Sequence, residues 1–145
     1  MRMAFLASSR ATCLRRKVGA VVVKEGHILS TGYNGAPKNM DHCEVAGCIR
    51  ERMKVPSGER HELCRGLHAE QNAIIQAAFF GVSIKDSTMY VTNHPCTVCA
   101  KMLINSGITE VVYSDDYVDP LAKKLLLEGG MTVRRLASSK DDKGV

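Results

Sequence analysis

Two short motifs in the sequence combine residue types that bind metal ions and transfer protons. Residues 68–70 read His-Ala-Glu, and residues 95–99 read Pro-Cys-Thr-Val-Cys. A spacing of three puts Cys96 and Cys99 on one face of a helix, and the unpaired N–H groups of a helix start favour the thiolate that a metal requires. One further ligand, His68, leaves a fourth tetrahedral position open for water, which is the arrangement of a catalytic zinc.

Glu70 supplies an acid beside this predicted metal site. On a mid-helix surface its side chain would diverge from that of His68 by about 200°. The two can converge only on something beyond the helix start, where a metal held by both motifs would lie. Glu70 would then lie beside the bound water, whose pKa zinc lowers to about 7, without binding the metal. We therefore predict that Glu70 is a general acid and base.

Length and composition restrict the class of protein. The chain has 145 residues, of which 45% are hydrophobic and 24% charged, so we expect one globular domain. No apolar run reaches the ~18–20 residues of a membrane span, and residues 1–10 indicate a helix rather than a secretory leader. The clustered Cys and His residues then favour metal binding in a reducing compartment, so we predict a cytoplasmic protein with no membrane partner.

Hydrophobic periodicity and turn residues predict the elements that hold the two motifs. Helices are expected over residues 2–13, 68–80, 96–106 and 120–128. Strands are expected over residues 18–24, 27–33, 87–92, 108–113 and 131–136, the first two as a hairpin. This pattern predicts one α/β domain over residues 1–136, with an irregular Cys-rich insert at 34–66, mostly parallel later strands and a polar tail at 137–145.

The order His-x-Glu, then Pro-Cys-x-x-Cys, is the signature of zinc nucleobase deaminases. The chain resembles the bacterial and phage deoxycytidylate (dCMP) deaminases of the cytidine deaminase-like superfamily, including those of competence operons, over residues 1–136. The resemblance rests on residues 17–21, 32–37, 68–74, 89–92 and 95–99. It implies a three-layer α/β/α fold with a five-stranded mixed sheet. It also implies hydrolysis of dCMP to dUMP and ammonia in pyrimidine deoxynucleotide metabolism.

The resemblance further implies roles for individual residues. The catalytic zinc would be bound by His68, Cys96 and Cys99, with Glu70 as general acid and base. Contacts to the substrate would come from Asn34, Ala69, Asn72 and Tyr117. Three of these have a structural alternative: turn geometry for Asn34, a loop anchor for Tyr117 and a helix face for Asn72.

Four cysteines remain, and four is the number that a closed structural zinc site needs. They are Cys13, Cys43, Cys48 and Cys64. Relatives of the resembled family carry a second, structural zinc here, with ligands that match Cys13 and Cys43. His42 or His61 could replace one of the other two, and four unligated thiols in a loop are the structural alternative.

The resemblance also implies regulation and assembly. dCTP, with Mg²⁺, would be an activator and dTTP an inhibitor of a homo-oligomer, a hexamer. The formal net charge of +5 fits a phosphorylated metabolite. Arg15, Arg16 and Lys17 are candidates for binding its phosphate, although such a run is also typical of a solvated basic face.

Two other functions fit parts of the sequence. A tRNA adenosine deaminase shares both motifs, but the chain has no clear basic stripe for a folded RNA, and we expect no nucleic-acid partner. A zinc-stabilised nucleic-acid-binding module without catalysis would explain the six cysteines. Glu70 argues against that module, because a structural site needs no acid between its ligands.

Overall fold

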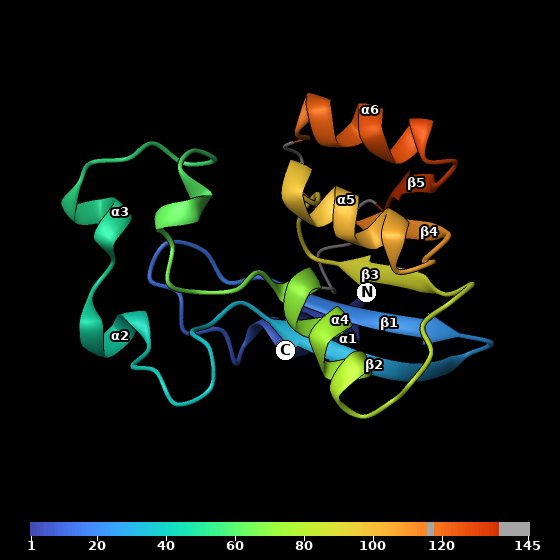
Figure 1. The fold of residues 1–145 in the computed structure, drawn as a ribbon, viewed down its shortest axis with the longest axis horizontal. Helices are drawn as coiled ribbons and strands as arrows, with labels where there is room; N and C mark the ends of the chain where they lie inside the picture. The colour runs from blue at the N-terminus through green and yellow to red at the C-terminus, as the bar shows by residue number, and fades with distance from the viewer. Residues whose placement is uncertain (116–117, 137–145) are drawn as a thin grey trace.

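The computed structural model describes residues 1–115 and 118–136, and its centre is a five-stranded sheet in the order β2-β1-β3-β4-β5 (Figure 1). The strands are β1 (Gly19–Lys24), β2 (His27–Tyr33), β3 (Thr88–Val91), β4 (Glu110–Tyr113) and β5 (Thr132–Arg135). β1 is antiparallel to β2 and β3, whereas β3, β4 and β5 run parallel, so the mixed sheet is confirmed. Tyr117 and the predicted tail, residues 137–145, lie outside the described residues.

The hairpin between β1 and β2 turns at Glu25 and Gly26, as the sequence predicts. Both residues have positive φ angles, 50° and 78°. A two-residue turn of this kind matches the twist of the flanking strands. The turn therefore fixes which residues of the two strands face each other across the sheet.

Four longer helices cover the sheet: α1 (Arg2–Ser8), α4 (Ala69–Phe79), α5 (Thr97–Asn105) and α6 (Pro120–Glu128). Figure 1 shows α4, α5 and α6 on one side of it. A Cβ atom at Gly32 would lie 2.1 Å from a carbonyl oxygen of α4, and one at Gly19 would lie 2.0 Å from a carbonyl oxygen of α1. Gly32 pairs with Ala20, the neighbour of Gly19, so these two contacts are on opposite faces. The predicted three-layer α/β/α fold is thus confirmed.

The core lies between the sheet and the helices α4, α5 and α6. Alternate strand residues point into it, because side chains alternate across a strand. These buried strand residues are Ala20, Val22, Met89, Val91, Val111 and Tyr113. Small residues of α4, Ala73 and Ala77, and larger ones of α5 and α6, Leu103 and Leu126, pack against them. This packing fixes the starts of α4 and α5, which carry the two sequence motifs.

The insert, residues 34–66, extends away from the sheet (Figure 1). It is less irregular than predicted, because it contains two α-helical turns, α2 (Cys43–Ala46) and α3 (Ile49–Arg52), and a 3₁₀ turn, η1 (His61–Leu63). Two backbone hydrogen bonds between Gly35 and Leu67, of 3.2 and 2.9 Å, close its base. Across the described residues, no helix has the length and apolarity needed to cross a membrane.

Candidate active site

Two helix starts bring the predicted metal ligands together. His68 is the residue before α4 and Cys96 the residue before α5, and both have extended backbone angles (φ −75°, ψ 159° and φ −76°, ψ 168°). The Gln71 side chain accepts a hydrogen bond from the His68 N–H group at 2.7 Å, which holds the backbone at this point. Because α4 packs on β1 and β2 and contacts α5, the two starts face each other at the edge of the core.

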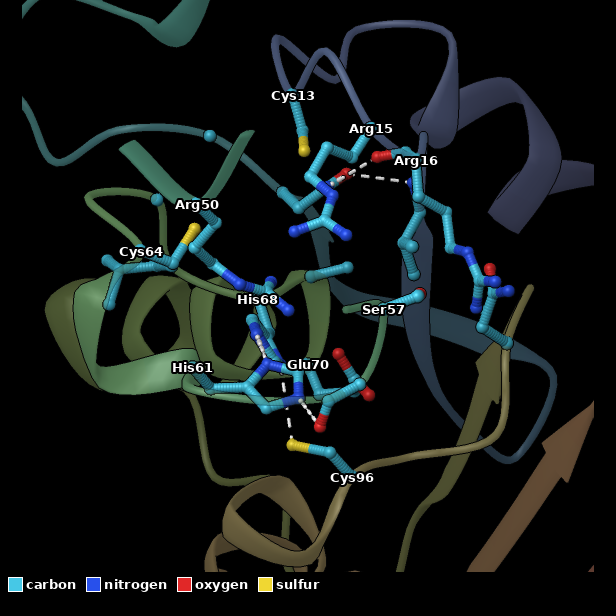
Figure 2. A pocket seen from close by; sticks show the side chains of 18 of the residues that line it. Cys13, Arg15, Arg16, Arg50, Ser57, His61, Cys64, His68, Glu70 and Cys96 are labelled. Carbon is cyan, nitrogen blue, oxygen red and sulfur yellow. Dashed lines mark hydrogen bonds between the residues drawn. The ribbon is translucent and has the colours of Figure 1, made fainter. Parts of the chain in front are cut away.

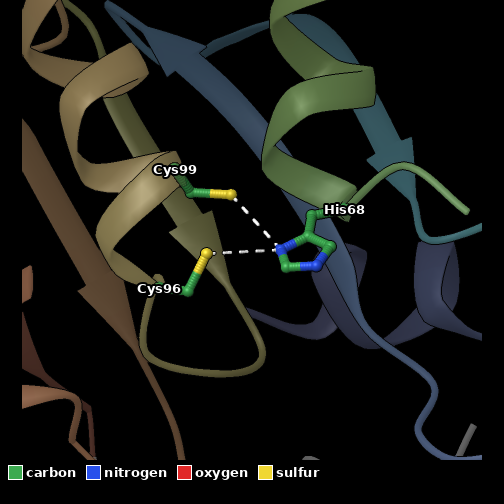
Figure 3. Close-up of side chains that lie close together, drawn as sticks. All are labelled: His68, Cys96 and Cys99. Carbon is green, nitrogen blue, oxygen red and sulfur yellow. Dashed lines mark hydrogen bonds between the residues drawn. The ribbon is translucent and has the colours of Figure 1, made fainter. Parts of the chain in front are cut away.

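The three predicted ligands have the geometry of a zinc site. The Sγ atoms of Cys96 and Cys99 lie 3.4 and 3.5 Å from Nδ1 of His68 (Figure 3). Tetrahedral bonds of ordinary length to zinc would place a nitrogen and a sulfur ligand about 3.5 Å apart. Within the described residues, only this group of three has all its ligand atoms within 4.8 Å of one another. The part of the chain that the structure describes therefore contains one His-Cys-Cys zinc site, and this prediction is confirmed.

The two thiols of this site differ in acidity. The hydrogen bond from the Cys99 thiol and the contact with His68 lower the pKa of Cys96 to about 3, although burial opposes the shift. The hydrogen bond to Cys96, together with burial, raises the pKa of Cys99. Cys96 is thus the thiolate of the pair and Cys99 the donor. Metal binding to both sulfurs must displace the proton of Cys99, so metal affinity rises with pH.

Glu70, the second residue of α4, is the buried acid of the site. Its side chain is 4% exposed. Burial raises its pKa to about 7, although the neighbouring charge of His68 lowers it. Both the acid and the carboxylate are therefore populated near neutral pH, as general acid–base catalysis requires.

A cavity of about 520 Å³ opens beside His68 and Glu70 (Figure 2). Its volume is typical of a small-molecule site. Figure 2 shows Arg15 and Arg50 pointing into it from the side opposite Cys96. Arg15 Nη1 and Arg50 Nε are buried and have no hydrogen-bond partner, and Arg50 is only 8% exposed. Arg50 Nη2 donates to the Pro56 carbonyl oxygen at 3.2 Å. A buried N–H group without a partner is costly, so the two free nitrogens make this end of the cavity suited to an anion.

Sequence analysis missed Arg50. It lies in α3 of the insert, between Cys48 and a proline-containing turn, and no motif or spacing marks it. Of the predicted basic run, Arg15 and Arg16 line the cavity. Arg16 is exposed and forms an ion pair with Asp115 at 3.5 Å.

The predicted substrate-binding residues lie at different distances from the cavity. Asn34 and Ala69 line it, whereas Asn72 does not. The Asn34 amide accepts a hydrogen bond from Val18 N–H at 2.8 Å and donates one to Arg16 O at 2.7 Å, which leaves one donor and one lone pair free. Asn72 donates to the Tyr33 carbonyl oxygen at 2.7 Å, next to Asn34. Contact with a substrate stays a prediction for all three residues, as it does for Tyr117.

The other four cysteines are neighbours in the insert and the loop after α1. All are free thiols, and Cys43 and Cys48 are buried. Burial and the nearby thiols of Cys64, Cys13 and Cys48 raise the pKa of Cys43. The predicted second zinc stays a prediction. Of the two alternative ligands, His42 contacts Thr12 Oγ1 at 2.8 Å, and His61 contacts His68.

This combination of a His-x-Glu motif and a Pro-Cys-x-x-Cys motif around one metal site is the signature of the zinc-dependent nucleobase deaminases. The family model described as "Cytidine and deoxycytidylate deaminase zinc-binding region" matches residues 1–115. The chain therefore belongs to the cytidine and deoxycytidylate deaminase family, which confirms the resemblance inferred from the motifs.

Individual relatives agree with this assignment. The chain is 38% identical to the deoxycytidylate deaminase of Saccharomyces cerevisiae over an alignment 144 residues long, which covers 97% of this chain but only 45% of the yeast protein. It is 36% identical to ComE operon protein 2 of Bacillus subtilis, over 94% of this chain and 68% of that protein. The crystal structure of the cyanophage S-TIM5 dCMP deaminase with dCMP and dUMP superimposes with a TM-score of 0.74 at 32% identity. That match covers 93% of this chain and 92% of the phage chain.

Proposed function

We propose that the protein hydrolyses dCMP to dUMP and ammonia. One observation carries the proposal: a single cavity is lined by the zinc ligands His68 and Cys96 and by Glu70, and also by Arg15 and Arg50, each of which has a buried guanidinium nitrogen without a hydrogen-bond partner. A cytosine mononucleotide has the matching groups, an amino-substituted ring and a phosphate. The relative of known structure from cyanophage S-TIM5 binds dCMP and dUMP, which supports the same substrate here.

Glu70 transfers the protons in this reaction. Zinc bound by His68, Cys96 and Cys99 supplies a Lewis acid that makes water nucleophilic near neutral pH. Glu70 takes a proton from the attacking water and delivers it to N3 as the water oxygen adds to C4 of cytosine. It then takes the remaining proton of that oxygen and passes it to the departing amino group as the C4–N bond breaks, which releases ammonia and leaves a C4 carbonyl group. A carboxyl group with a pKa of about 7 can serve in both directions.

Arg15 and Arg50 hold the phosphate in this proposal. Guanidinium groups bind phosphate oxygens through paired, charge-assisted hydrogen bonds. Asn34 and the backbone of Ala69, which line the same cavity, contact the sugar and base. Asn72 does not contact the substrate itself; its side chain holds the Tyr33 carbonyl group, and so supports the neighbouring residue Asn34. Tyr117 is retained as a contact to the nucleotide on the family resemblance alone.

A second, structural zinc is part of the proposal. Its ligands are Cys13, Cys43, Cys48 and Cys64. The thiols of Cys13, Cys48 and Cys64 are near enough to raise the pKa of Cys43, although no three of the four sulfurs lie within 4.8 Å of one another. The ligand assignment therefore rests on family resemblance. Family resemblance also supports a hexamer, activation by dCTP with Mg²⁺, inhibition by dTTP and a cytoplasmic location.

Ammonia release tests the substrate. We expect turnover of dCMP to exceed that of deoxycytidine, cytidine, dCTP and adenosine-containing tRNA. Turnover of tRNA alone, or of deoxycytidine as fast as dCMP, would overturn the assignment. If the zinc-loaded protein turned over none of these substrates, the alternative of a non-catalytic nucleic-acid-binding module would be favoured.

Arg50→Met tests the phosphate contact. We expect it to raise the KM for dCMP by at least about tenfold, which is the effect of one charged hydrogen bond, and to leave the KM for deoxycytidine unchanged. Arg52→Met is the matched control, because Arg52 lies on the same helical turn but is exposed and outside the cavity. An equal effect of both variants, or none from Arg50→Met, would exclude Arg50 from phosphate binding.

A further inference from the structure

The zinc ligand His68 has a histidine partner on the side away from the metal site. Its Nδ1 atom faces the two thiols, whereas its Nε2 atom lies 3.2 Å from Nδ1 of His61 (Figure 2). The two rings meet edge to face, with centroids 5.0 Å apart and an interplanar angle of 72°. His61 is thus placed to act on the metal site without entering it.

The other nitrogen of His61 is also engaged. Its Nε2 atom lies 2.9 Å from the carbonyl oxygen of Gly58. A carbonyl oxygen can only accept, so Nε2 of His61 must carry a proton. In a neutral His61 the Nδ1 atom is then an acceptor, and the proton between the two rings must belong to Nε2 of His68. In the neutral His68 that metal binding requires, Nδ1 then has a lone pair for the metal.

We infer that His61 is a positioning residue of the zinc site, which holds His68 in the tautomer and orientation that present Nδ1 to the metal. The Gly58 carbonyl group fixes the tautomer of His61, and His61 fixes that of His68. Partners of this kind orient metal-binding histidines and increase their basicity. The inference rests on the zinc site and not on the identity of the substrate.

The backbone at Gly58 supports the arrangement. Its φ angle is +85°, in the left-handed region that favours glycine. The turn at Gly58 therefore aims a main-chain carbonyl group at His61. Because both ring nitrogens of His61 are used, the inference also removes His61 from the candidates for the second zinc site.

Zinc affinity is the direct test, and it needs no substrate. The dissociation constant of the catalytic zinc is measured by competition with a chelator for wild type, His61→Leu and His61→Asn. His61→Leu removes the acceptor, and we expect it to weaken zinc binding about 10–100-fold. His61→Asn places an amide oxygen where Nδ1 was, so we expect its affinity to stay within a few-fold of wild type. His27→Leu, at an exposed histidine on β2, is the matched control and should have no effect.

The tautomer gives a second readout. In zinc-loaded protein with ¹⁵N-labelled histidine, we expect NMR to show a proton on Nε2 of His68, protected from exchange in wild type and His61→Asn and exposed to exchange in His61→Leu. Unchanged zinc affinity in His61→Leu, or equal losses in the Asn and Leu variants, would overturn the inference. So would a loss confined to a second equivalent of metal, since His61 would then be a ligand of the other site. If His61→Leu does not fold, two measurements remain. A zinc affinity of His61→Asn near that of wild type, together with a protected proton on Nε2 of His68 in wild type, would support the inference, and the absence of either would overturn it.

Discussion

The carboxylate of Asp119 accepts hydrogen bonds from both the N–H group and the hydroxyl group of Thr97, at 3.2 and 3.1 Å. Its other oxygen caps α6 by accepting from the N–H groups of Leu121 and Ala122, at 3.0 and 3.1 Å. Burial opposes ionisation of Asp119, but these hydrogen bonds hold its pKa below the ordinary value. One side chain therefore joins the starts of α5 and α6. Its contact on α5, Thr97, is the residue directly after the zinc ligand Cys96.

Asp119→Ala should lower both stability and zinc affinity. The lost cap alone costs about 1 kcal/mol, and the start of α5 loses its anchor to α6. Because the pKa of Asp119 is lowered, its stabilising effect is present above the ordinary pKa of an aspartate and is lost as the pH falls through the lowered value. Thermal unfolding and zinc titration measure both effects. Asp41→Ala, at an exposed aspartate, is the control, and equal melting temperatures of the two variants would contradict the anchoring role.

Glu70→Gln should abolish turnover and keep the metal. Glutamine has nearly the same size and shape but cannot transfer protons, so a loss of about 10²–10⁴-fold or more in kcat is expected. Zinc content should equal that of wild type, whereas Cys96→Ser should lose zinc. Turnover and metal content are measured on the same samples. Retained turnover would refute the proton-transfer role, and lost zinc would make Glu70 a metal ligand.

The difference in stability between Glu70→Gln and wild type should depend on pH. The pKa of Glu70 is raised to about 7 in the folded protein, so ionisation of the buried carboxyl destabilises the fold. This cost appears as the pH rises from the ordinary glutamate pKa through about 7, and at full ionisation is on the order of 3 kcal/mol. Glu70→Gln, which stays neutral, should become more stable relative to wild type across that window. Denaturant unfolding of metal-free protein at several pH values measures the difference, and a constant difference would contradict the shift.

Cys48 offers a test of the second metal site that separates a ligand from a buried apolar side chain. A free buried Cys behaves as a small hydrophobe, so Cys48→Ala should then be tolerated better than Cys48→Ser. If Cys48 binds zinc, both variants should lose one equivalent of metal and melt at a similarly lower temperature. Metal analysis and thermal unfolding distinguish the two cases. Unchanged metal content in both variants would exclude Cys48 as a ligand.

Gly32→Ala should displace α4 and the ligand at its start. The added methyl group would lie 2.1 Å from the Ala69 carbonyl oxygen and 2.5 Å from Ala73 N, both backbone atoms of α4. Overpacking of this kind costs about 1–3 kcal/mol, and the shift of α4 should also weaken zinc binding. Thr31→Ala, at the adjacent exposed position of β2, is the control. Equal stability of the two variants would show that the helix can move without cost.

The metal ligands and most elements could be predicted because local signals mark them. Glycines, prolines and apolar periodicity mark the ends of α4, α5 and α6, and the two motifs mark the ligands. The predicted helix over residues 2–13 was too long, because the Ser8 and Ser9 hydroxyl groups bond back to the Phe5 and Leu6 carbonyl oxygens as α1 ends at Ser8.

The parts that could not be predicted depend on contacts between distant segments. Arg50 and His61 reach the site from short turns of the insert, whose course depends on tertiary packing. The bond from His61 to His68 also depends on where Gly58 places its carbonyl oxygen. Neither the spacing nor the type of these residues in the sequence indicates that they meet at the zinc site.

The insert supplies groups to both ends of the cavity, since Arg50 faces the anion-binding end and His61 supports the zinc ligand. Gly35 and Leu67 close its base with paired backbone hydrogen bonds, so the segment begins and ends at one place on the sheet. A chimera that exchanged only this segment with a relative would therefore replace the proposed phosphate contact and the proposed support of the metal ligand together. In such a chimera, nucleotide preference and zinc affinity would change together. Glu70 and the three metal ligands lie outside the exchanged segment and would stay the same.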